Sequence, residues 1–171
     1  EAPVALDAAN QILINLGVQF HPQKTRIVNV QHGFEFLGYK IKRGKRPLSL
    51  PANKIRSGVR SGDLYAIPKE KSIQRFMDQV RHRTKRRVPL DTEALIKGIN
   101  PLIRGWGNYF KRAHVRKLFN RLDRWIVRRI WSHKFKRWRC AGWKTLPASI
   151  LYGELGLVNL VGLISSIASR K

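Results

Sequence analysis

A helical repeat of apolar residues runs through residues 114–139 and limits what this part of the chain can fold into. The apolar side chains recur every three or four residues, which places them on one side of an α-helix. Such a stripe must pack against other elements, because helical propensity alone rarely stabilises a helix in water. The residues of the stripe are Val115, Leu118, Phe119, Leu122, Ile126 and Ile130.

Another face of the same predicted helix carries a row of cations that continues, at the same spacing, into two aromatic residues. The row comprises Lys117, Arg121, Arg124, Arg128, Trp131 and Phe135. Cations pair with phosphates, and aromatic or Arg planes stack on unpaired bases, so the row is suited to RNA. A solvated face normally mixes its charges, yet Asp123 is the only acid in this helix. For the two aromatics, packing on the C-terminal tail is the alternative interpretation.

The charge balance indicates the kind of partner. Lys and Arg number 35 against 10 Asp and Glu, which gives a net charge of +25. This charge opposes a compact state by self-repulsion unless a polyanion neutralises it. Phosphate contacts release counterions and give strong, salt-sensitive affinity, so nucleic acid is the expected partner. An apolar content of 43% is enough for a folded core.

An anionic membrane is the rival polyanion, and the sequence argues against it. The longest uncharged stretch near the C-terminus, residues 155–169, is shorter than the roughly 20 residues that cross a bilayer. Cys140 is the only cysteine, which excludes a disulfide framework and a zinc finger. No secretory signal is visible, and the chain begins at Glu1, as a piece of a longer protein would. A bacterial cytoplasm or an organelle matrix is the expected compartment.

The N-terminal part shows mixed periodicity. Residues 3–16 have a helical period, and Gly17 is well placed as the C-terminal cap. Short strands are expected at residues 18–20 and 26–30, on either side of a turn at His21.

Residues 33–41 alternate as a strand does, except that Leu37 and Gly38 break the register. An interior glycine in a strand often marks a bulge or a close backbone approach. Residues 42–68 are basic and rich in Gly, Ser and Pro, which predicts a loop. The short strands expected within it are residues 47–50 and 64–67.

Three helices are predicted at residues 72–85, 91–110 and 114–139, and their short connections favour an antiparallel bundle. Asp91 is a suitable N-cap for the second helix. Pro101 lacks a backbone donor, so that helix is expected to kink or restart there. The predicted fold is therefore mainly α, a helical bundle with a small N-terminal α+β part. After residue 147, one or two short helices are expected to pack on the bundle.

The most specific motif is Gly-Ile-Asn-Pro-Leu-Ile-Arg-Gly-Trp-Gly-Asn-Tyr-Phe at residues 98–110. Its glycines permit close backbone approach, and Arg104 offers a fork for phosphate or carboxylate. Trp106 and Tyr109 each combine a large ring with one polar group. The residue types alone leave two interpretations open, a tight helix–helix crossing and a contact with nucleic acid.

This motif closely resembles the signature of the maturase-specific region, or domain X, of group II intron reverse transcriptases. Residues 16–27 look like the block of these enzymes that follows the catalytic aspartates. Residues 33–41 look like the next block, which grips the primer end. Together with the basic helical region, the three motifs cover most of residues 15–140 in the order that the family has.

The resemblance implies four segments and two nucleic-acid partners. The segments are the end of a palm with a primer-grip-like strand (1–47), a basic linker (48–68), the thumb and maturase-specific helices (69–145) and a C-terminal packing tail (146–171). The partners are structured group II intron RNA, bound for splicing, and an RNA/DNA primer–template, bound during RNA-directed DNA synthesis. The missing N-terminal polymerase portion is a further expected partner.

Candidate binding residues follow from the resemblance and from the basic face of residues 114–139. The primer-grip-like residues are Phe36, Leu37, Gly38 and Tyr39. The expected RNA-binding residues are Arg104, Trp106, Asn108, Tyr109, Lys117, Arg121, Arg124, Arg128 and Trp131. In the alternative interpretation, Arg104, Trp106 and Tyr109 are mostly structural, and exposed Lys and Arg make the contacts.

One departure from the family concerns catalysis. Nucleotidyl transfer needs clustered carboxylates that hold two metal ions, and this sequence has no Asp-Asp pair. We therefore expect no catalytic residue, metal or cofactor in this chain, with Mg²⁺ required only by an intact polymerase. Lys24 matches a family lysine proposed as a general acid. Without the aspartates, a phosphate or salt-bridge role is expected for it.

Three hypotheses follow. The first is an RNA-binding fragment of a group II intron reverse transcriptase/maturase that is inactive alone. The second is one half of a split, active RNA-directed DNA polymerase. The third is a general basic RNA-binding protein whose motif matches are accidental.

Overall fold

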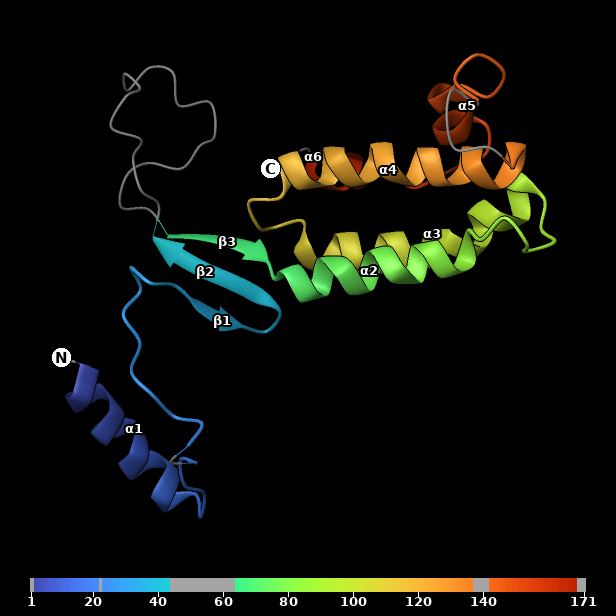
Figure 1. The fold of residues 1–171 in the computed structure, drawn as a ribbon. Helices are drawn as coiled ribbons and strands as arrows, with labels where there is room; N and C mark the ends of the chain where they lie inside the picture. Colours follow the sequence, from blue (N-terminus) through green and yellow to red (C-terminus); the bar gives the residue numbers. More distant parts are fainter. Residues whose placement is uncertain (1, 22, 44–63, 137–141, 169–171) are drawn as a thin grey trace, which may run out of the picture. The chain divides into compact units, whose positions relative to one another are not determined.

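The computed structural model is mainly helical, with a small antiparallel sheet, which confirms the predicted fold class (Figure 1). It describes residues 2–21, 23–43, 64–136 and 142–168, and side chains as far as residue 164. No helix in these ranges is long and apolar enough to cross a membrane.

The chain divides into two compact units. One comprises residues 1–34 and 41–64, and the other residues 35–40 and 65–171. Three strands form a sheet in the order β1-β2-β3. The segment boundaries expected at residues 47, 68 and 145 stay predictions.

Helix α1 (Ala2–Asn15) begins the first unit, and none of its side chains is buried. Gly17, which has a φ of 71°, caps its C-terminal end as expected. The amide of Gly17 donates to the carbonyl of Ile14 at 3.0 Å, and the amide of Val18 donates to Leu13 at 2.9 Å. This pair of bonds is the Schellman arrangement, which satisfies carbonyls that the last turn leaves open.

The prediction of short strands at residues 18–20 and 26–30 is wrong. Neither segment has regular structure, and Val18 and Ile27 are exposed. A strand needs a ladder of hydrogen bonds with a neighbour, however apolar its own residues are. The carbonyl of Val30 accepts from the amide of Arg43 at 3.4 Å and, within its own turn, from the amide of Gly33 at 3.1 Å, and these two bonds do not make a ladder. The expected turn forms, because the carbonyl of His21 accepts from the amides three and four residues further on, at residues 24 and 25.

Residues 33–41 do not form one bulged strand but a hairpin of β1 (Phe34–Phe36) and β2 (Tyr39–Arg43). Leu37 has a φ of 44° and Gly38 a φ of 80°. Positive φ at both central residues is the backbone of a type I′ turn, which matches the twist of paired strands. Strand β3 (Leu64–Pro68) confirms the short strand expected there, whereas residues 47–50 lie outside the described residues.

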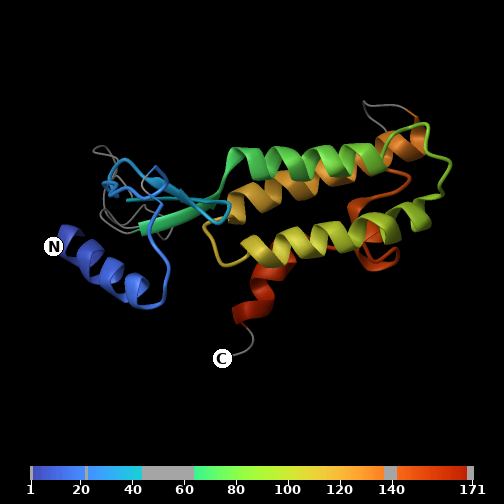
Figure 2. The ribbon, with the colours of Figure 1, turned by 90° about the horizontal axis from the view of Figure 1, so that it is seen from below.

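Three long helices form the predicted antiparallel bundle in the second unit (Figures 1 and 2). They are α2 (Glu70–Arg83), α3 (Thr92–Phe110) and α4 (Arg116–Phe135). Asp91 caps α3 as expected, its carboxylate accepting from the amide of Ala94 at 2.8 Å. Helix α4 is shorter than predicted at both ends, because Val115 is its N-cap and Lys136 turns left-handed, with a φ of 55°.

The apolar stripe of α4 is the centre of the core. Five of its six residues are buried and Leu118 is half-buried. They pack with Phe76 and Val80 of α2 and with Ile99 and Ile103 of α3. Complete burial of such a side chain stabilises the fold by about 1.5–3 kcal/mol.

Pro101 neither ends nor restarts α3, which runs unbroken from residue 92 to residue 110. The proline and Lys97, whose carbonyl loses its helical partner, are both exposed, so water can satisfy that carbonyl. Ile99 and Ile103 anchor the helix in the core on either side of the proline. Tertiary packing therefore overrides the local signal.

The tail forms the two short helices that were expected, α5 (Ala148–Gly153) and α6 (Leu160–Ala168). The buried carboxylate of Asp123, on α4, accepts from the amides of Leu160 at 2.9 Å and Val161 at 3.1 Å. Asn159 accepts from the third amide, that of Gly162, at 2.9 Å. Acceptors at a helix start satisfy amides that have no partner within the helix.

Two glycines of α3 offer a matched test of this packing. A Cβ at Gly98 meets nothing within 4 Å, whereas one at Gly107 would lie 2.6 Å from Leu163 Cδ1 and 2.7 Å from Leu160 Cδ2. We expect Gly98→Ala to raise the free energy of unfolding by about 0.5–1 kcal/mol through helix propensity. Gly107→Ala should lower it by about 1 kcal/mol, because overpacking outweighs that gain. Urea unfolding measures both, and equal stabilisation would contradict the close α3–α6 approach.

Candidate nucleic-acid interface

The Trp of the Arg-Gly-Trp-Gly-Asn-Tyr-Phe motif lies on the inner side of α3. The ring of Trp106 stacks on Phe76 with centroids 4.6 Å apart, and it also contacts Phe110 and Phe119. Its indole nitrogen is buried without a hydrogen-bond partner. The following glycine, Gly107, faces α6 as described above. The positions of Trp106 and Gly107 therefore support the interpretation of this part of the motif as a tight helix–helix crossing.

Tyr109 joins the motif to the hairpin turn. Its hydroxyl donates to the carbonyl of Leu37 at 2.7 Å, and the hydroxyl of Tyr39 donates to the carbonyl of Tyr109 at 2.5 Å. The two rings stack with centroids 5.5 Å apart. Burial, then the neighbouring Tyr109, raises the pKa of Tyr39 above its ordinary value, so the Tyr39 phenol stays protonated as a donor at neutral pH. Two motifs that are far apart in sequence are thereby brought together.

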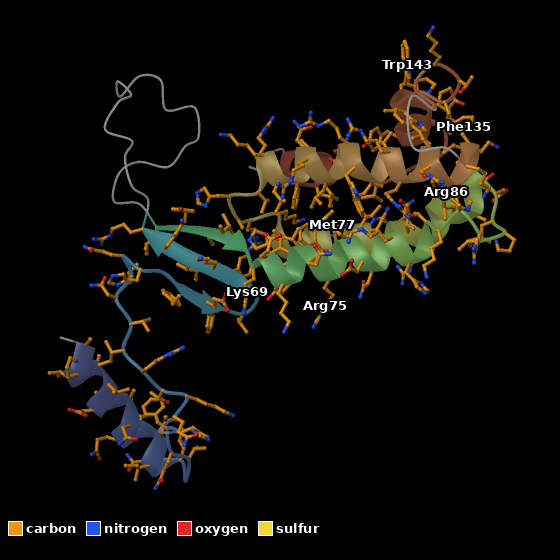
Figure 3. All side chains as sticks on the ribbon, in the orientation of Figure 1. Lys69, Arg75, Met77, Arg86, Phe135 and Trp143 are labelled. Atoms are coloured by element: carbon orange, nitrogen blue, oxygen red, sulfur yellow. The ribbon has the colours of Figure 1, made fainter. Side chains whose placement is uncertain are left out.

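A groove of about 540 Å³ opens beside this contact, between α2, α3 and the hairpin turn. We call it the hairpin groove. Leu37, Gly38, Arg75, Gly105 and Tyr109 are among its lining residues. The side chain of Arg75 points away from α4 (Figure 3). The groove combines two of the four primer-grip-like residues with residues of the α3 motif.

Leu37 has an unusual position at the apex of the turn. It is 68% exposed, although it is apolar, and its positive φ is costly for any residue with a branched or bulky side chain. Phe36, beside it, is 58% exposed. Strain of this kind with no gain from burial is a common feature of binding sites.

The four predicted cations of α4, namely Lys117, Arg121, Arg124 and Arg128, are all exposed. Three ion pairs form among the described residues, and none of them involves these side chains. Their charges are therefore not neutralised within the described part of the fold.

Arg124 and Arg128 border a second groove, of about 520 Å³, between α4, α5 and the start of α6. We call it the α4 groove. Its lining residues are Arg116, Asn120, Asp123, Arg124, Val127, Arg128, Trp131, Ala148, Tyr152, Asn159 and Val161. Burial raises the pKa of the Asp123 carboxyl, although its two amide donors act in the opposite direction. Burial, followed by the charge of Asp123, raises the pKa of the Tyr152 hydroxyl.

Trp131 packs against the C-terminal tail, one of its two expected roles, and also lines the α4 groove. Its indole N–H donates to the carbonyl of Leu146 at 2.8 Å. A Cβ at Gly142 would lie 2.4 Å from the ring, and Gly142 has a φ of 96°. Phe135 is half-buried near the end of α4 (Figure 3).

A second basic region was not among the predicted binding residues. The run Arg-His-Arg-Thr-Lys-Arg-Arg at residues 81–87 ends α2, and Arg86 lies at this end of the bundle (Figure 3). Two cations, one on α4 and one directly after it, donate to backbone carbonyls here. Arg129 donates to the carbonyl of Thr84 at 3.1 Å and to that of Arg81 at 3.3 Å, while Lys136 donates to that of Arg86. Burial, then Arg81 and Arg86, lowers the pKa of the Arg129 guanidinium.

The other candidate residues are exposed and separate from these grooves. Arg104 and Asn108 lie on the outer side of α3, and Lys24 lies in the first unit. Within the described ranges, no three His, Cys, Asp or Glu side chains gather as a metal ion requires.

A known family matches the part of the chain that carries the basic face of α4 and the packed motif of α3. Residues 73–147 match the family model of the group II intron, maturase-specific domain. The range takes in α3, α4 and most of α2, and we call it the maturase-specific region. The resemblance drawn from the motifs is confirmed over this range, and it indicates involvement in group II intron splicing and RNA binding. No curated protein matched the chain.

The residues that border the α4 groove could be anticipated only in part. Arg124, Arg128 and Trp131 follow from helical spacing, and Arg116 lies on the same face of α4. Tyr152 belongs to the tail, and no local pattern links it to α4. The basic run at residues 81–87, by contrast, is visible in the sequence as a charge cluster.

The hairpin turn allows a stability test. We expect Leu37→Asn to raise the free energy of unfolding by about 1 kcal/mol, because Asn tolerates positive φ and Asn-Gly favours a type I′ turn. Phe36→Asn, at a similarly exposed strand position, is the control and should lower it. Urea unfolding of both variants is the measurement. Equal destabilisation would show that the leucine is not strained.

Proposed function

We propose that the chain binds structured group II intron RNA for splicing through the exposed face of α4. The observation that carries this proposal is the set of unneutralised cations at residues 117, 121, 124 and 128 within the maturase-specific region. RNA phosphates neutralise such a row and release counterions. The packed bundle sets the spacing of those contacts, which shape-dependent recognition of folded RNA requires.

The function test compares two RNAs. The affinity of the chain is measured against salt concentration for a structured group II intron RNA and for an unrelated hairpin of equal length. Tighter binding to the intron RNA, with a preference that persists at high salt, supports the proposal. Equal affinities with equal salt slopes would reduce the chain to a general basic RNA-binding protein.

Single substitutions locate the surface. Arg121 is exposed without an ion pair in the described structure, whereas Lys97, on α3, pairs with Glu93 at 2.8 Å. We expect Arg121→Gln to reduce the slope of log affinity against log salt by about 1, the loss of one phosphate contact. Lys97→Gln, the matched control, should leave the slope unchanged. Thermal melting checks that both variants fold, and equal slopes for both would move the binding surface off α4.

A second candidate function is primer–template binding within a reverse transcriptase, with the catalytic carboxylates and their Mg²⁺ supplied by another polypeptide portion. The hairpin groove supports it, because an exposed strained Leu37 and Arg75 line one cleft. In this proposal the chain alone is inactive. Mixing it with an N-terminal polymerase portion that carries Tyr-x-Asp-Asp, and adding Mg²⁺, should restore primer extension. No extension from the mixture would count against a split polymerase.

A further inference from the structure

The α4 groove has the dimensions of a site for a small organic group. Its volume of about 520 Å³ lies within the range of about 300–1,000 Å³ that is usual for ligand pockets. Helix α4 forms one wall, and α5 with the start of α6 forms the other. A single base can enter a cleft of this size, whereas an RNA duplex can only lie across its mouth.

The aromatic wall is held in place before any ligand arrives. The bond from Trp131 to the carbonyl of Leu146 and the close approach of Gly142 fix the indole ring. Tyr152 reaches the groove from α5 and is half-buried. Fixed rings lose little conformational freedom when a base stacks on them, so stacking retains most of its favourable energy.

The charge of the acid at the floor, Asp123, is partly offset within the fold. Both oxygens of Asp123 accept backbone amides of α6, from Leu160 and Val161. The positive end of the α6 dipole further offsets the carboxylate charge. Among the described residues that line the groove, Asp123 is the only acid, and these contacts reduce its repulsion of an anion.

Three arginines line the groove beside these rings. The helical rise of about 1.5 Å per residue spaces Arg124 and Arg128 about 6 Å apart along α4, and places Arg116 about 12 Å before Arg124. None of the three takes part in an ion pair in the described part of the chain. Such spacing lets guanidinium groups pair with phosphates on both sides of a base held in the groove.

From this juxtaposition we propose that the α4 groove holds one unpaired nucleobase of bound RNA, stacked on the aromatic wall, while the arginines pair with its flanking phosphates. The inference rests on the proposed RNA-binding function and adds a ligand class to it, an unpaired nucleotide in single-stranded RNA. A surface that bound RNA through charge alone would not need an apolar cleft between its arginines.

The test uses the full chain and two probes, a short oligoadenylate and an abasic oligonucleotide of equal length and charge. Both probes offer the same phosphates, so the ratio of their affinities isolates the contribution of the bases. We expect oligoadenylate to bind about 10-fold more tightly, as base stacking on aromatic side chains allows.

A groove-filling variant and its neighbour locate the base. Ala148 lines the groove, and Ser149 is the next residue of α5 but is exposed outside it. Ala148→Phe should bring the affinity ratio to about 1 without weakening the abasic probe. Ser149→Phe, the matched control, should keep the ratio of the unaltered chain. Tyr152→Leu, which keeps apolar volume but removes the ring, should lower the ratio, and thermal melting checks all three variants.

Equal binding of the two probes by the unaltered chain, or a ratio that Ala148→Phe leaves unchanged, would overturn the inference. These outcomes are distinct from those for the proposed function. A chain that prefers intron RNA yet binds both probes equally would retain the function and lose the groove. A chain that distinguishes the probes without preferring intron RNA would retain the groove and lose the function.

Discussion

The burial of one face of α4 is the constraint on which the rest of the bundle depends. Its apolar stripe packs against α2 and α3. Two of its polar side chains form hydrogen bonds with backbone groups at the ends of other helices. Arg129 donates to the last carbonyls of α2, and Asp123 accepts from the first amides of α6. Because these contacts fix the rotation of α4, they also determine which residues face outward. The exposed cations are therefore positioned by the core, and a change in the core packing would move them.

The cations of α4 divide into two groups with different partners. Arg129 donates to backbone carbonyls at the end of α2, where the helix dipole is negative, and Lys136, which directly follows α4, donates to the carbonyl of Arg86 in the loop after α2. Arg121 and Arg128 face outward and have no acidic partner among the described residues. The first group stabilises the free protein. The second adds to a net charge of +25, which costs stability until a polyanion binds. This division is expected of a protein that is most stable when it is bound to RNA.

Local signals predicted the elements well, and contacts between distant residues explain where they failed. The Asp91 cap, the end of α1 at Gly17 and the α4 stripe follow from short-range spacing, so the sequence contains them. The local sequence at Pro101 predicts a break in the helix, yet the burial of Ile99 and Ile103 on either side of it keeps α3 continuous. The two grooves were not predictable as shapes, because each combines the helices with residues far away in sequence. Tyr152 in the α4 groove and Leu37 in the hairpin groove acquire their neighbours only in the fold.

The central claim is that α4 presents the RNA-binding surface, and cross-linking tests it most directly. Ultraviolet cross-linking of the chain to a structured group II intron RNA, followed by mass spectrometry, identifies the amino acids that touch RNA. The account predicts that cross-linked residues concentrate in α4 and α5, between residues 116 and 153. Cross-links concentrated instead on the outer side of α3, at Arg104 and Asn108, or in the first unit, with α4 free of them, would contradict it.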